Sequence, residues 1–144
     1  MATIDTDYTN EKVFEISNRR NQSEQILEYL RSCVINKRRM VGFNNRSFDY
    51  TLVHYMIEKA KKCKARGKQC LFTAREMWKQ TQEYFEKQKD SERSFANIRD
   101  SDVIIPQVDL YLIHHFDNKA RSTSLKMLEF NMRSDEIEDL PFPV

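Results

Sequence analysis

Two asparagines, an aromatic residue and an aspartate follow a short apolar segment of the chain. Residues 40–43 read Met-Val-Gly-Phe, and Asn44, Asn45, Phe48 and Asp49 come after them. A strand over 40–43 followed by a helix would place the carboxylate at the carboxyl end of the strand, where open α/β sheets have their active sites. A carboxylate there can bind a hard divalent cation, and the amide and aromatic side chains beside it can contact a nucleic acid.

The same residue types also occur where no ligand binds. Asn and Asp are frequent at strand–turn–helix junctions, because their side chains hydrogen-bond to nearby backbone amides. A capped helix with nothing bound is therefore the alternative interpretation of the window 44–49 taken alone.

The order Gly-Phe-Asn-Asn-x-x-Phe-Asp over 42–49 resembles the second motif of the DEDD-type 3′–5′ exonucleases of the ribonuclease H-like superfamily. It is most similar to the proofreading exonuclease of family B DNA polymerases, in which an Asn lies five residues before the Asp, as Asn44 does before Asp49. Residues 103–128 resemble the part of these exonucleases that follows, where an Asp-Leu pair leads to a Ser-Leu helix. The resemblance covers residues 10–60 and 100–140, and the stretch between them resembles an insertion.

This resemblance implies roles for four residues. Asp49 would be catalytic and would help to hold two Mg²⁺ or Mn²⁺ ions, while Asn44, Asn45 and Phe48 would bind a single strand. The strand would be DNA, with RNA as an alternative, and a polymerase domain in the same parent chain is a further implied partner.

Most of the carboxylates that such an exonuclease needs are missing from the sequence. The family uses an Asp-x-Glu on its first strand, the Asp of the second motif and a final Asp after a Tyr or His, because two cations about 4 Å apart must be neutralised. The chain has no Asp-x-Glu before Asp49 and ends before a Tyr-x-x-x-Asp. We therefore expect a fragment of an exonuclease domain, with a two-metal site only in the complete domain. The alternative is a catalytically inactive, nuclease-derived module that binds nucleic acid or another protein.

Three further aspartates are candidate metal ligands. Asp5 and Asp7 could stand in for the first motif, but Tyr8-Thr-Asn-Glu-Lys follows them and is typical of a turn. We therefore favour a hairpin with arms at 2–5 and 13–16 and with both aspartates in its turn. Asp109 follows a predicted strand and could approach the metal site.

The order of predicted elements is strand, strand, helix, strand, helix, helical insertion, strand, helix. Asn21 with Glu24, and Thr73 with Glu76, have the spacing of capping boxes at helix starts. The order predicts an α/β fold, namely a partial ribonuclease H-like layer of three or four strands with packed helices and a helical insertion at about 59–101. We expect the strands at 13–16 and 40–43 to belong to one sheet.

Composition predicts one domain over 1–144, since 40% of the residues are apolar and 32% are charged. No segment approaches the length of a membrane span, and no apolar signal segment is present, so we expect a cytoplasmic or otherwise intracellular protein without membrane contact. The three cysteines are then expected as reduced thiols. Residues 59–68 carry six Lys or Arg and no acid, which favours a solvated helix end over a phosphate-binding segment.

Overall fold

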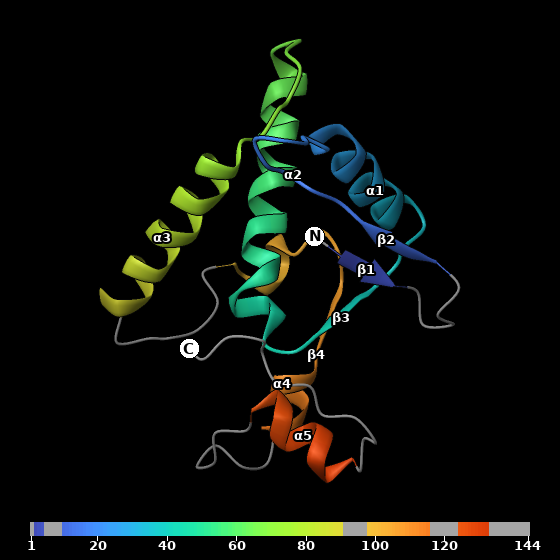
Figure 1. Ribbon diagram of the computed structural model, residues 1–144, viewed down its shortest axis with the longest axis vertical. Helices are drawn as coiled ribbons and strands as arrows, with labels where there is room; N and C mark the ends of the chain where they lie inside the picture. The colour runs from blue at the N-terminus through green and yellow to red at the C-terminus, as the bar shows by residue number, and fades with distance from the viewer. Residues whose placement is uncertain (1, 5–9, 91–97, 116–123, 133–144) are drawn as a thin grey trace.

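Short strands and longer helices make up the described part of this protein, which is a computed structural model covering residues 2–4, 10–90, 98–115 and 124–132 (Figure 1). No helix within these ranges is both long enough and apolar enough to cross a membrane. The strands are β1 (Ala2–Ile4), β2 (Glu11–Val13), β3 (Met40–Gly42) and β4 (Gln107–Asp109). The α-helices are α1 (Ser23–Ile35), α2 (Asp49–Ala65), α3 (Ala74–Asp90), α4 (Leu110–His114) and α5 (Leu125–Asn131).

The described strands form two separate pairs. Strand β1 is antiparallel to β2, so the predicted hairpin forms, but its second arm is Glu11–Val13 and not the predicted 13–16. Its turn with Asp5 and Asp7 lies outside the described residues. Strand β3 is parallel to β4, with Gly42 opposite Asp109. The mixed α/β class is thus confirmed, and the ribonuclease H-like layer remains a proposal.

The prediction that residues 13–16 and 40–43 share a sheet is wrong for the described strands. Strand β2 pairs with β1, and its residues, including Val13, are exposed. An exposed strand has no apolar face to align it against β3, so the hydrophobic pattern does not specify that pairing. Ile16 makes only an isolated bridge to Asn21 before helix α1 begins.

The core lies where α1 and α2 meet the segments before α3 and β4. Helix α1 contributes Ile26 and Leu30, which are four residues apart and therefore share one face. Tyr50 of α2 is buried, and its hydroxyl accepts hydrogen bonds from the amides of Ile104 at 2.7 Å and Ile105 at 3.1 Å. These bonds satisfy the buried phenol and tie the segment that leads into β4 to helix α2.

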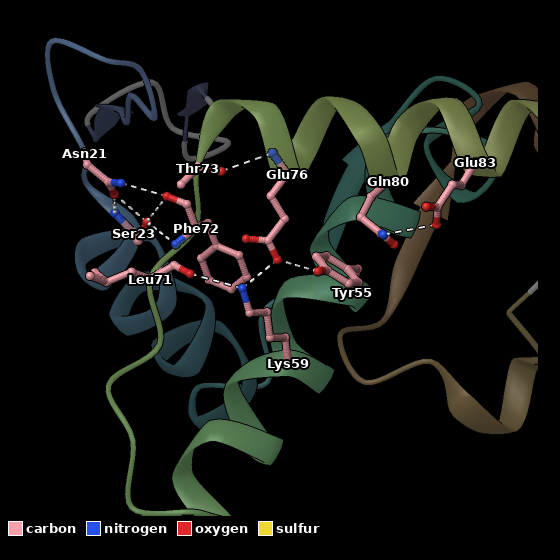
Figure 2. Close-up of polar contacts among 10 residues, drawn as sticks. All are labelled: Asn21, Ser23, Tyr55, Lys59, Leu71, Phe72, Thr73, Glu76, Gln80 and Glu83. Atoms are coloured by element: carbon pink, nitrogen blue, oxygen red, sulfur yellow. Dashed lines mark hydrogen bonds and ion pairs between the residues drawn. The ribbon is translucent and has the colours of Figure 1, made fainter.

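The segment that resembles an insertion takes part in this core. Helix α2 continues without a break to Ala65, and Phe72 is fully buried. The Phe72 carbonyl accepts a hydrogen bond from Asn21 Nδ2 at 2.7 Å, and its amide donates to Ser23 Oγ at 3.1 Å (Figure 2). Asn21 Oδ1 accepts from the Ser23 amide, whereas Glu24 accepts from Gln69, so the predicted Asn21–Glu24 capping box does not form.

Helix α3 is joined to α2 by a polar cluster around Glu76. Lys59 Nζ and the Tyr55 hydroxyl each donate to Glu76 Oε1 at 2.5 Å (Figure 2). Lys59 also donates to the Leu71 carbonyl at 3.1 Å. Thr73 Oγ1 accepts from the Glu76 amide at 3.1 Å, which confirms the predicted Thr73 cap. The Glu76 carboxylate, however, faces α2 instead of the helix end.

We expect the contribution of Glu76 to stability to depend on pH. Burial acts to raise the pKa of Glu76, but the hydrogen bonds from Lys59 and Tyr55 together hold it below its usual value of 4.5. The stabilisation is therefore present above that value and is lost as the pH falls through the lower folded-state pKa. Glu76→Gln should reduce the free energy of unfolding at pH 7 by about 1 kcal/mol, with the deficit shrinking in acid.

Urea unfolding of both proteins across pH 3–7 measures this difference. Glu83→Gln is a matched control on the same helix, because the Glu83 side chain is 42% exposed, meets Lys79 at 3.6 Å and accepts one hydrogen bond from Gln80 at 3.2 Å, so it should change stability little. If Glu76→Gln lowers the free energy of unfolding by the same amount at every pH, the stabilisation does not depend on the ionised Glu76 carboxylate and the prediction is wrong.

Candidate functional site

The predicted motif lies at the junction between β3 and α2. After β3, the chain passes through a 3-10 turn at Asn45–Ser47, and helix α2 begins at Asp49. Asn44 adopts a left-handed conformation with φ of 54°, which asparagine tolerates better than most residues. Asp49 therefore lies in the first helical turn at the carboxyl end of β3, as the sequence predicts.

The Asp49 side chain is exposed, and it does not act as the helix cap. The N-cap position of α2 is Phe48, and no side-chain cap hydrogen bond is present there. A negative charge in the first turn interacts favourably with the positive end of the helix dipole. Asp49 therefore places a fixed negative charge at this edge, open to a cation.

Asp109 holds the turn in place. Its Oδ1 accepts from the amides of Asn44 at 2.7 Å and Tyr111 at 3.1 Å, and its Oδ2 accepts from the Arg46 amide at 3.1 Å. The side chain is 5% exposed. A buried carboxylate is satisfied by such amide donors, so the structure places this candidate metal ligand in a positioning role for the turn that precedes Asp49.

Asn45 is buried and faces β4 instead of the surface. Its Nδ2 donates to Gln107 Oε1 at 2.5 Å, and Gln107 Nε2 donates to the Ile105 carbonyl at 2.7 Å. Because the Ile105 carbonyl can only accept, the NH₂ group of Gln107 must face it, which leaves Gln107 Oε1 toward Asn45. The NH₂ group of Asn45 must then face Gln107 Oε1. Asn45 Oδ1 has no hydrogen-bond partner among the described residues. Asn45 therefore links the turn to β4, and its predicted contact with a nucleic-acid strand would need this bridge to open.

The Asn45 side chain lies so close to the backbone of residue 42 that only glycine fits there. A Cβ at position 42 would lie 2.9 Å from Asn45 Cβ and 3.1 Å from its Cγ. Such contacts would displace Asn45 from Gln107. Gly42 and Gln107 support the position of Asn45 and were not predicted, and the only sequence signal for them is the Gly two residues before the Asn pair.

Phe48 presents an aromatic surface next to Asp49. Its side chain is 43% exposed, and its ring centroid lies 5.7 Å from that of Phe85 on α3. The Phe85 ring is in turn 6.3 Å from Tyr84. A partly exposed aromatic surface of this kind can stack against a nucleobase.

A cavity of about 710 Å³ opens beside these residues, between β3, α2 and the start of α3. Asn45, Asp49 and Gln107 are polar members of its wall. Most other lining residues are apolar and come from β3 and three helices, including Ile26, Tyr29, Met40, Val53, Met56 and Met77. The site therefore combines one exposed carboxylate with a largely apolar hollow.

The donor set for a metal is incomplete in the described part of the chain. No group of three or more His, Cys, Asp or Glu side chains is placed there to hold a metal ion. Asp49 offers a hard oxygen ligand that fits Mg²⁺ or Mn²⁺, while Asp109 is occupied by three amides and Asp5 and Asp7 lie outside the described residues. One carboxylate alone does not form a two-metal site.

No protein-family model matches the chain, and no match is found among the curated proteins or the solved structures. The resemblance to exonucleases therefore depends on the motif at 42–49 and the segment 103–128.

Proposed function

We propose that the chain is the central segment of a metal-dependent 3′–5′ exonuclease domain that acts on single-stranded nucleic acid, with DNA as the substrate. The observation that carries the proposal is the placement of Asp49. Its exposed carboxylate lies in the first turn of α2, at the carboxyl end of a parallel strand. A metal ligand of an α/β nuclease is expected at this edge.

Asp49 and the residues around it would each have a different role in the site. Asp49 would hold a cation together with carboxylates from other parts of the domain, and Phe48 would stack on a base of the strand. Asn44 would contact the sugar–phosphate backbone, while Asp109 fixes the turn that presents all three. When bound, two Mg²⁺ or Mn²⁺ ions would activate the attacking water and stabilise the leaving oxygen.

The cavity beside β3 supports the proposal that the chain is only part of a domain. In the described part of the chain, β3 pairs only with β4, so its other edge has unpaired backbone groups. The adjoining hollow is lined mainly by apolar side chains of β3, α1, α2 and α3. A further strand with apolar residues would fill it and pair with β3, and in the family that we propose such a strand carries the Asp-x-Glu.

A second candidate function is a catalytically inactive module that binds nucleic acid or a protein. The observation in its favour is the basic segment at 59–68, in which Lys61, Lys62, Lys64, Arg66 and Lys68 have exposed or partly exposed side chains. These cations could contact phosphates without any metal.

The coding DNA on both sides of this reading frame tests the proposal. We expect an in-frame Asp-x-Glu upstream and a Tyr-x-x-x-Asp downstream, with a polymerase domain following in the same parent chain. Stop codons on both sides without these motifs would contradict the exonuclease proposal and favour the second function.

A further inference from the structure

Arg46 lies within the turn that carries the candidate site. It is the only lysine or arginine in residues 40–58, which run from β3 through the turn into helix α2. It occupies the middle of the 3-10 turn Asn45–Ser47, three residues before Asp49. Its backbone amide donates to Asp109 Oδ2 at 3.1 Å, so the place of Arg46 in the turn does not depend on its side chain. A substitution that changes only this side chain should therefore leave the turn intact.

The Arg46 guanidinium is paired with a carboxylate that little else holds in place. It donates a hydrogen bond to Asp100, which lies 54 residues away in the sequence, and the two side chains form an ion pair. The Arg46 side chain is 24% exposed, whereas that of Asp100 is 87% exposed. An ion pair with so exposed a partner contributes little to stability, so it can open at little cost.

A phosphodiester can take the place of Asp100 on this guanidinium. Carboxylate and phosphate groups both offer paired anionic oxygens to the parallel N–H donors of arginine. The exposed Asp49 carboxylate lies three residues from Arg46, and Asp102 lies in the same turn as Asp100, so a phosphate that approaches this edge meets several negative charges. Arg46 supplies the positive charge that such a phosphate needs in order to bind there.

We propose that Arg46 binds a phosphate of the single strand, and that the Asp100 carboxylate occupies the Arg46 guanidinium until that phosphate displaces it. The inference rests on the proposed function, because the strand is the one that Asn44 and Phe48 would bind. In the exchange, the guanidinium N–H groups pass from the carboxylate to the phosphate oxygens, and Asp100 turns to solvent. Asp100 therefore lowers the affinity for the strand by competing for Arg46.

Fluorescence anisotropy of a labelled oligothymidylate, titrated with the 144-residue chain at several salt concentrations and without divalent cations, tests the role of Arg46. Arg46→Gln should weaken binding at least about fivefold at low salt and reduce the slope of log affinity against log salt by about 0.7, the share of one phosphate contact on a single strand. Arg46→Lys should keep the slope but lose affinity, because an ammonium group cannot make the paired hydrogen bonds. Thermal unfolding should show that both variants remain folded.

Asp100→Asn tests the competition. It should tighten binding by about two- to fivefold, a factor that matches the strength of a surface ion pair. The gain should disappear in the Arg46→Gln background, where there is no guanidinium to release. Asp102→Asn is the matched control, because it removes the same charge from the same turn, but the Asp102 carboxylate accepts from Ser101 and does not pair with Arg46. It should change the affinity less than Asp100→Asn does.

Arg66→Gln controls for the position of the lost charge. Arg66 directly follows helix α2, whose 17 residues separate it from Asp49 by about 25 Å along the axis. Equal losses in Arg46→Gln and Arg66→Gln would place the strand on the basic segment 59–68 and overturn the inference. A gain from Asp100→Asn that persists without Arg46, or no detectable binding by the native chain, would also overturn it.

The inference and the proposed function can fail separately. If the complete domain degrades DNA in an Asp49-dependent manner but Arg46→Gln binds the strand normally, only the role of Arg46 is refuted. If the complete domain is inactive although strand binding depends on Arg46, the exonuclease proposal is refuted, and a phosphate-binding site remains.

Discussion

Asp49→Asn in the complete exonuclease domain that we propose should reduce nucleotide release by at least about a hundredfold and leave the melting temperature almost unchanged. Asparagine keeps the size of the side chain but removes the charge that would hold a divalent cation. The stability should hardly change, because the exposed Asp49 side chain makes no cap hydrogen bond in the structure. Turnover on a labelled single strand and thermal unfolding, measured on the same preparations, check both parts.

Asp49→Ala distinguishes this role from a capping role. If Asp49 is a metal ligand, the alanine variant should lose activity as the asparagine variant does. If it acts only as a cap, asparagine should retain full activity, and alanine should cost about 1 kcal/mol of stability. Full turnover by the Asp49→Asn variant would contradict the proposal that Asp49 is a catalytic metal ligand.

Asp109→Ala should lower the free energy of unfolding by about 3 kcal/mol, because it leaves the amides of Asn44, Arg46 and Tyr111 without their acceptor. Asp109→Asn keeps one acceptor oxygen and should fall between the alanine variant and the native chain. Urea unfolding at pH 7 measures these differences.

Asp100→Ala is the matched control for Asp109. Asp100 pairs with the Arg46 side chain, but its own side chain is 87% exposed, so its removal should change stability by less than about 1 kcal/mol. Equal effects of the two alanine substitutions would show that Asp109 does not support the turn.

Local features of the fold were predictable because they depend on neighbouring residues. The turn chemistry after Asp7 indicated the hairpin, although Glu11 and Lys12 belong to its second strand. The Asn pair before Phe48 indicated a helix with Asp49 in its first turn. Thr73 was recognised as a cap from its spacing to Glu76. In each case, residues close in sequence determine the conformation.

Long-range partners were not predictable in the same way. Asp109 binds amides that lie 63 and 65 residues away, and nothing in its immediate sequence distinguishes such an anchor from a metal ligand. Asn21 bonds to Phe72 across 51 residues, which explains why its predicted pairing with Glu24 fails. The sheet prediction failed because the exposed strand β2 carries no apolar face to specify its partner.

Release of nucleotides from a labelled single-stranded DNA with Mg²⁺ or Mn²⁺, by this chain and by the complete domain side by side, tests the central claim most directly. The complete domain should remove nucleotides from the 3′ end. The 144-residue chain should show little or no turnover, because one exposed carboxylate cannot hold two cations. An inactive complete domain, or robust Asp49-dependent degradation by this chain alone, would contradict the account.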